Sequence, residues 1–186
     1  MPGDSRIERQ SPARELIFVM MRISSAVVVA VFLILVVIPE WQRHRLLKRI
    51  YESDDAAEKL NAARDLARLG RPAVPDIVDA LRSNDPWVIL GAVEAVEKLG
   101  PTAVDAVPTL IELVQRNGYE IRWGAEGALG AIGPSAKAAI PALIAEVRFG
   151  KGDMNQEFAR MALEKIDPRA LVEAEAGTPE DVPRAE

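Results

Sequence analysis

Along residues 54–168, small and aliphatic residues occur at the spacing of a helix, and this helical pattern is repeated several times. Four stretches align, each ending in an aliphatic residue, then Gly or Asp, and then a proline within two positions: 62–70, 92–100, 125–133 and 159–167. In the second stretch, Ala92, Ala95, Val96 and Leu99 stand at i, i+3, i+4 and i+7, which is one apolar stripe on a helix. A glycine followed by a proline is typical of the end of a helix.

Three copies of a second pattern lie between these stretches. Each copy begins with Val-Pro or Ile-Pro and continues with aliphatic residues at helical spacing: 74–81, 107–114 and 140–147. The prolines, Pro75, Pro108 and Pro141, are 33 residues apart both times. They fit the first turn of a helix, where a missing N–H costs nothing. Because a single helix pair cannot bury both of its faces, we expect neighbouring pairs to stack into a solenoid.

The run Gly-Ala-Glu-Gly-Ala-Leu-Gly-Ala-Ile-Gly-Pro-Ser-Ala-Lys-Ala-Ala-Ile-Pro-Ala-Leu-Ile at 124–144 resembles the HEAT-repeat family, in particular its short repeats named from phycobilisome lyases. The resemblance covers roughly residues 54–168 and implies an all-α fold. It implies an α-solenoid of about three HEAT-like helix pairs, preceded by an additional helix near 54–69. The expected pairs are 72–99, 104–132 and 137–166. In this family the Ala-rich helices line the concave side, and of the family's turn ladder only Asp85 and Arg122 are present.

An apolar run precedes the repeats at residues 16–38. It holds 23 residues with one charge, Arg22, and would reach about 34 Å as a helix, enough to span a bilayer. A cleaved signal peptide and a buried helix of a soluble domain are the alternatives. No small-residue cleavage pattern comes after the run, so we favour a retained transmembrane helix. The expected organisation is a polar segment (1–15), the membrane helix, a basic juxtamembrane segment (39–53), the repeat domain and an acidic disordered tail (169–186).

Basic residues come directly after the apolar run. They are Arg43, Arg45, Lys48 and Arg49, with His44 among them. The positive-inside rule predicts a single-pass membrane protein whose repeat domain is cytoplasmic. The cluster serves either as the flank that stops transfer or as a patch for anionic lipid headgroups.

Composition narrows the chemistry. The chain has no cysteine, and His44 is its single histidine, so disulfides, thiolate metal sites and the usual catalytic triads are excluded. The net charge is −5, whereas nucleic-acid binders usually carry a basic surface, so we expect no nucleic-acid partner. No combination of residues indicates a catalytic, cofactor or metal site, and Asp55 fits a helix N-cap.

A candidate binding groove emerges on the expected concave face. The residues that point away from the buried stripes, together with the glycines between them, are Trp87, Leu90, Trp123, Gly127, Gly130, Met154 and Met161. Each helical glycine costs about 1 kcal/mol relative to alanine, which suggests that something approaches closely there. A partner segment could do so, with the tryptophans as anchors. Ordinary packing between repeats is the alternative, as is occupation of the face by residues 41–51.

The expected function is therefore a membrane-anchored HEAT-repeat module for protein–protein interaction, an adaptor, scaffold or assembly factor without catalysis. Its partners would be an unknown protein and, through residues 16–38, the lipid bilayer. Two alternatives stay open: a bilin lyase-like enzyme, which the family resemblance permits, and a purely structural subunit of a membrane complex.

Overall fold

The computed structural model describes residues 27–116, 118–150 and 153–176. Within these ranges the regular structure is helical, and no strand occurs. The chain divides into two compact units, residues 1–42 and 43–186.

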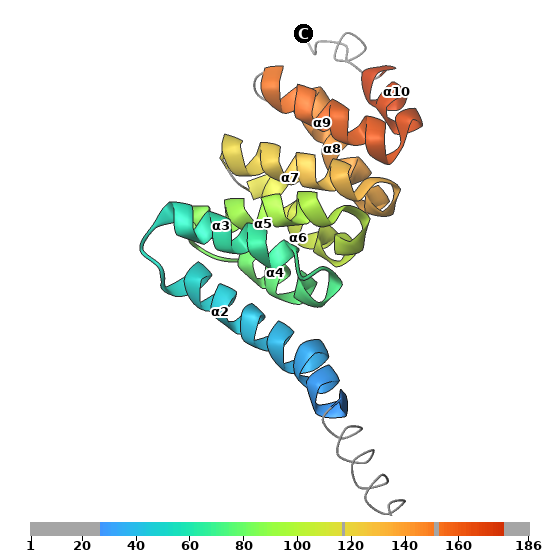
Figure 1. The fold of residues 1–186 in the computed structure, drawn as a ribbon. Coiled ribbons are helices and arrows are strands. Elements are labelled where there is room, and N and C mark those ends of the chain that lie inside the picture. The colour runs from blue at the N-terminus through green and yellow to red at the C-terminus, as the bar shows by residue number, and fades with distance from the viewer. Residues whose placement is uncertain (1–26, 117, 151–152, 177–186) are drawn as a thin grey trace, which may run out of the picture. The chain divides into compact units, whose positions relative to one another are not determined.

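The second unit is a stack of helices in two layers (Figure 1). Four helices pack in succession to form one layer: α3 (Ala56–Ala67), α5 (Pro86–Leu99), α7 (Tyr119–Ile132) and α9 (Asp153–Ile166). The other layer holds α4 (Val74–Leu81), α6 (Val107–Arg116) and α8 (Ile140–Phe149), and α10 (Pro168–Ala176) packs on α8 and α9. Helix α2 (Ile38–Glu52) begins in the first unit and ends in the second. The expected all-helical solenoid is confirmed.

The helix boundaries agree with the sequence signals. Helices α4 and α8 begin with Val-Pro and Ile-Pro, so that each proline stands in the first turn. Gly100 and Gly133 adopt positive φ angles of 55° and 70° directly after α5 and α7, a backbone conformation that strains residues with a side chain. Each is followed by a 3₁₀ segment, η3 (Gly100–Ala106) or η4 (Gly133–Ala139), before the next pair begins.

The core lies between the two layers and is filled by aliphatic side chains. Buried alanines lie where successive helices of the first layer contact each other, and they include Ala63, Ala92 and Ala125. The largest fully buried apolar side chains are Ile50, Leu66, Ile77, Leu81, Leu110, Leu129, Ile132, Leu143 and Leu163. The chain remains helical beyond Pro168, where we expected the tail, because Ala170 and Ala174 of α10 are buried against the last pair.

Asp85 joins two neighbouring helices of the stack. Its carboxylate accepts the backbone N–H of Trp87 at 2.9 Å, capping α5, and it also accepts a hydrogen bond from Lys59 of α3. That lysine hydrogen bond holds the pKa of Asp85 below its usual value. The predicted cap at Asp55 is likewise present on α3, where the carboxylate accepts from Ala57 at 2.9 Å.

Replacing Asp85 with alanine should lower the free energy of unfolding by about 1–2 kcal/mol, because α5 loses its cap and Lys59 loses its acceptor. Urea denaturation at pH 7 measures the loss. Asp79→Ala is the control, since Asp79 is exposed and its ion pair with Arg82 is long, at 3.7 Å. Equal stability of the two variants would contradict the proposed role of Asp85.

Helix α2 is tied to the repeats by two of the basic residues that come after the apolar run. Arg43 donates to Asp76 of α4, with one N–O distance of 2.9 Å, and Arg49 donates to Glu58 of α3 at 2.8 Å. Ile50 is fully buried. Arg45 and Lys48 are exposed, and Lys48 lies 3.6 Å from Glu52; a role of the basic cluster in binding lipid headgroups stays a prediction.

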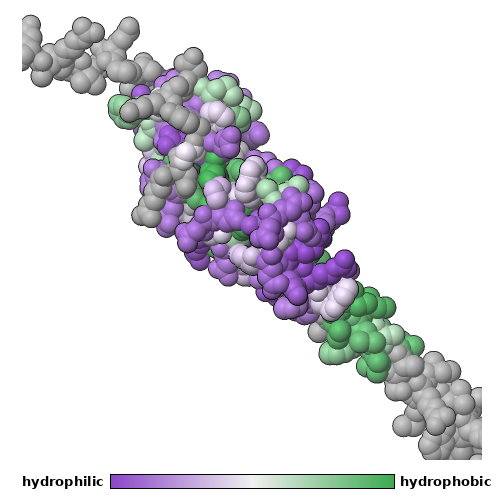
Figure 2. Space-filling view, turned by 90° about the vertical axis from the view of Figure 1, so that its left-hand side faces the viewer, coloured by the Kyte–Doolittle hydropathy of each residue, from purple (hydrophilic) through white to green (hydrophobic). Residues whose placement is uncertain are grey.

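The first part of the expected membrane helix, residues 16–26, lies outside the described residues. Its last part, residues 27–38, is helical and includes the π-helical turn η1 (Leu33–Val37). Its described large side chains are exposed and form a continuous apolar area, whereas the view of residues 43–176 in Figure 2 is mainly polar.

One helical stretch of the described residues, Glu120–Phe149, has the length and apolar composition to cross a membrane. It comprises α7, η4 and α8, and the backbone leaves the helical conformation at Ala136. Because Leu129, Ile132 and Leu143 are fully buried, the repeat core accounts for its apolar composition.

A candidate binding hollow between α5, α7 and α9

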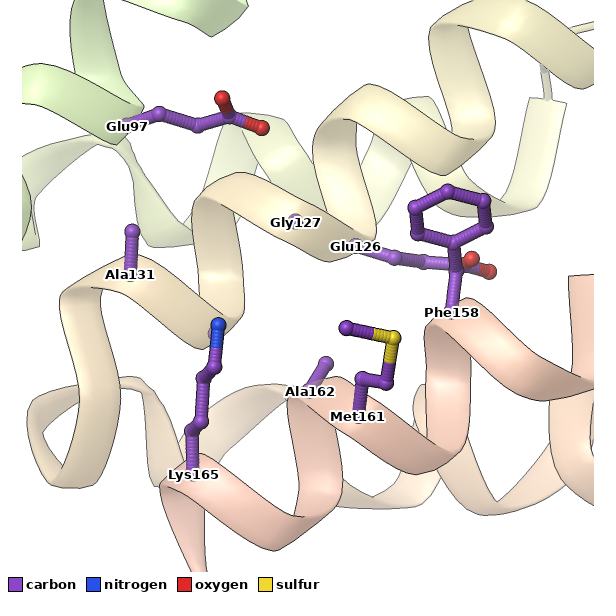
Figure 3. Close-up of a pocket in the computed structure, with 9 residues that line it drawn as sticks. Glu97, Glu126, Gly127, Ala131, Phe158, Met161, Ala162 and Lys165 are labelled. Carbon is purple, nitrogen blue, oxygen red and sulfur yellow. The ribbon is translucent and has the colours of Figure 1, made fainter.

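The layer of α3, α5, α7 and α9 carries a hollow of about 250 Å³. Three helices line it, and Figure 3 shows most of the lining side chains converging on one space. The lining residues are Glu97 of α5, Glu126, Gly127, Gly130 and Ala131 of α7, and Phe158, Met161, Ala162 and Lys165 of α9.

The floor of the hollow is formed by small residues of α7. A Cβ at Gly130 would lie 3.2 Å from Cα of Ala162, so the glycine lets α7 and α9 approach closely. A Cβ at Gly127 would lie 2.6 Å from Oε1 of Glu97, whose side chain reaches over the α7 backbone. Gly130 therefore lets α7 pack closely on α9, and Gly127 leaves room for the side chain of Glu97.

Glu126 is the unusual residue of the hollow. Its side chain is fully buried, and within the described part of the chain neither carboxylate oxygen has a hydrogen-bond partner. Burial raises its pKa to about 8, the negative charge of Glu146 adds to the rise, and Arg122 opposes it. At neutral pH this carboxyl group is therefore mainly protonated.

Glu97 and Lys165 carry the other two charges of the hollow. Both side chains are exposed in part, and Figure 3 shows them reaching toward α7 from opposite sides. Burial raises the pKa of Glu97, Glu94 adds to the rise, and Lys165 opposes it. The rim therefore offers one acid and one base, while the unpartnered acid lies beneath.

The structure brings together some of the residues that the sequence analysis placed in a groove. Gly127, Gly130 and Met161 line the hollow, whereas Leu90 is partly buried outside it. Trp87 and Met154 also lie outside it, with 50% and 53% of their surface exposed. Whether these residues bind a partner stays a prediction.

Trp123 is engaged within the stack. Its indole N–H donates to Oδ1 of Asn155, which is buried, and its ring stacks on Phe158 with centroids 5.8 Å apart. These contacts join α7 to α9. This geometry matches the alternative of ordinary packing between repeats.

Sequence reasoning missed Glu126 and Phe158. A signal for Glu126 was present, because aligning the four stretches places it at the position of Ala63 and Val93 in the two preceding stretches and of Arg160 in the last one. Ala63 and Val93 are both buried. A carboxylate at a core position of the repeat is expected only where a specific partner compensates for its burial.

Metal chemistry gains no support from the geometry. Across the residues that the structure describes, no group of three or more His, Asp and Glu side chains is placed to hold a metal ion. Repeat solenoids of this kind are typical of scaffolds without catalysis.

Comparisons with known proteins agree with this architecture. The family described as HEAT repeats matches residues 44–130. The crystal structure of an engineered protein is 23% identical, with 72% of this chain and 68% of that chain covered and a TM-score of 0.52. A designed armadillo repeat protein is 18% identical, covering 71% and 70%, with a TM-score of 0.53.

Another designed armadillo repeat protein, solved in complex with the peptide (KR)4, is 18% identical, covering 71% and 70%, with a TM-score of 0.52. No curated protein matches the chain. These likenesses do not single out the short phycobilisome-lyase type, which stays a prediction. The chain is thus an all-helical solenoid of the HEAT and armadillo kind, with HEAT repeats matched over residues 44–130.

Proposed function

We propose that this chain is a non-catalytic protein–protein interaction module, an adaptor, scaffold or assembly factor, anchored in a membrane by residues 16–38. The observation that carries the interaction role is the hollow between α5, α7 and α9, with the unpartnered Glu126 beneath its apolar wall. The HEAT and armadillo repeat fold, typical of interaction scaffolds, supports the same conclusion.

The stack itself gives no reason to keep Glu126. A buried polar group without a partner costs about 1–3 kcal/mol, and the equivalent Val93 fills its place in the preceding repeat without that cost. A residue that weakens the fold at one position of a regular repeat is typical of a binding site. Phe158 and Met161 beside it provide the apolar surface that a peptide segment needs.

A photoreactive residue tests the interaction role. When it replaces Met161 in the full chain in native membranes, we expect crosslinks to a partner protein, because Met161 lines the hollow and 45% of its surface is exposed. The same residue in place of the exposed Ala145 of α8, in the other layer, is the control and should give none. Equal crosslinking from both positions, or none from Met161, would overturn the proposal.

The membrane anchor rests on residues 16–38 and on the flank that begins at Pro39. The described apolar side chains between 27 and 38 are exposed, which suits contact with lipid rather than with a protein core. Trp41, with 60% of its surface exposed, fits the membrane interface, and the exposed Arg45 and Lys48 fit the cytoplasmic flank. In carbonate-washed membranes the full chain should stay in the pellet, whereas a chain without residues 1–38 should be released. Release of the full chain would rule out the anchor.

A further inference from the structure

We infer that the hollow between α5, α7 and α9 binds a cationic side chain, arginine or lysine, from a basic segment of the partner protein, with its head group paired to the carboxylate of Glu126. This inference rests on the proposed interaction function and specifies the chemistry of the partner.

The acceptor is in place and lacks a donor. Both carboxylate oxygens of Glu126 are buried without a hydrogen-bond partner among the described residues. A guanidinium group presents two parallel N–H donors to the two oxygens of a carboxylate, and an ammonium group presents one or more. Such a head group would satisfy both oxygens at once.

The charge around Glu126 favours a cation. The charged side chains that face it or share its hollow come from four helices: Arg122 of α7, Glu97 of α5, Glu146 of α8 and Lys165 of α9. Arg122 donates to Glu146 at 3.2 Å, and Lys165 acts on Glu97. Arg122 also favours the ionised form of Glu126 but donates no hydrogen bond to its carboxylate oxygens, so a cation that enters the hollow supplies the donor that they lack.

The size of the hollow fits one side chain. Its volume of about 250 Å³ is below the roughly 300–1,000 Å³ typical of small-molecule sites. The floor at Gly130 packs against Ala162 and Lys165 of α9, and the space over Gly127 holds the flexible side chain of Glu97, which has to move aside for an aliphatic stem to lie along α7. Figure 3 shows the carboxylate of Glu126 beside Phe158 and Met161 pointing from α9 toward α7, and a methionine can change rotamer to widen the hollow.

Binding should be linked to proton release. With the hollow empty, the pKa of Glu126 is about 8, so at pH 7 most molecules carry a neutral carboxyl group. A bound cation favours the ionised form, and the carboxyl proton passes to solvent. The affinity should therefore rise with pH, by up to about tenfold per pH unit below the pKa, and level off above it.

A labelled peptide tests the inference on the full chain in detergent. Fluorescence anisotropy with an octapeptide of alternating Lys and Arg should show about tenfold tighter binding at pH 7 than at pH 6. Glu126→Gln should weaken binding at pH 8 by at least about tenfold and remove the pH dependence, because the amide carries no charge. Glu120→Gln removes the same formal charge from the exposed surface of α7 and should change the affinity less than about twofold.

Further variants keep the test decisive. Gly127→Leu should block the floor without changing the charge, so it should weaken binding even if Glu126→Gln disturbed the fold. Equal affinity of the wild type, Glu126→Gln and Gly127→Leu would overturn the inference. Tighter peptide binding after removal of residues 1–15 would also overturn it, since this chain's own arginines would then be the occupant.

Failure of the inference and of the proposed function are distinguishable. If the peptide does not bind but Met161 still gives crosslinks, the inference that the hollow binds a cationic side chain is wrong, and the proposed interaction function is still supported. Absence of crosslinks from Met161 in native membranes would overturn the interaction function itself.

Discussion

Raising the pH from 5 to 8 should lower the free energy of unfolding by up to about 1.4 kcal/mol per pH unit, and Glu126→Gln should remove this decline. The pKa of Glu126 rises from 4.5 to about 8 in the folded chain. Between these values the folded state keeps a proton that the unfolded state releases. The stability is therefore full below pH 4.5 and is lost as the pH rises through 8, by roughly 5 kcal/mol in total.

The other acids with shifted pKa values do not obscure the effect of Glu126 on stability between pH 5 and 8. The pKa of Asp85 and the pKa of Glu58 are lowered by hydrogen bonds from Lys59 and Arg49, so their titration affects stability below pH 5. Burial raises the pKa of Glu97, which adds to the slope in the same direction at the acidic end.

Denaturation of the full chain in detergent at pH 5, 6, 7 and 8 measures the slope. Glu120→Gln should keep the wild-type slope, since Glu120 is exposed. At pH 8, Glu126→Gln should be more stable than the wild type by about 4 kcal/mol, because ionisation of Glu126 stabilises the unfolded wild type far more than the folded wild type. Parallel pH profiles of wild type and Glu126→Gln would show that Glu126 does not titrate as the structure indicates.

This expectation connects stability to function. A variant that gains stability and loses the binding of a basic peptide would show that Glu126 is retained for its partner rather than for the fold. Glu126→Gln therefore tests, by two independent measurements, how much the buried carboxyl group destabilises the fold and whether it binds a basic peptide.

Much of the fold could be predicted because the repeat signals are local. Pro75 and Pro141 fix where helices begin, and Gly100 and Gly133 fix where helices end, each through its own backbone geometry. Helix α10 could not be predicted, because its sequence is acidic and its helix is held by tertiary contacts. Arg148 of α8 donates to the backbone carbonyls of Glu173 and Ala174, at 2.8 and 3.2 Å, and those contacts exist only once the stack has formed.

The candidate site was predictable only in part for the same reason. Helical periodicity placed Gly127, Gly130 and Met161 on one face, and in the structure they share a hollow. The indole of Trp123 faces a buried acceptor on Asn155, which is 32 positions away in the sequence. Periodicity gives the face of a helix but does not show which neighbour's polar group lies opposite.

Replacing Gly91 with leucine should destabilise the fold by about 3 kcal/mol or more, because α3 and α5 lie too close together at this position to admit a larger side chain. A Cβ at Gly91 of α5 would lie 2.8 Å from Cβ of Ala63 and 3.3 Å from Cα of Leu60, both on α3. Neither atom belongs to the far end of a flexible side chain, so α3 and α5 must separate. The roughly 1 kcal/mol gained in helix propensity would not offset this.

The loss should be local, because each repeat of a solenoid contacts only its neighbours. Hydrogen exchange should therefore speed up in α3 while α9 stays protected, and urea denaturation should give the total loss. Gly118→Leu is the matched control, since a Cβ there meets no atom within 4 Å and its φ of −62° suits any residue. If both leucine variants unfold at the same urea concentration, α3 does not pack on α5 as closely as the structure indicates. The same result would contradict the proposal that small residues set the spacing of the whole layer, including Gly130 beneath the hollow.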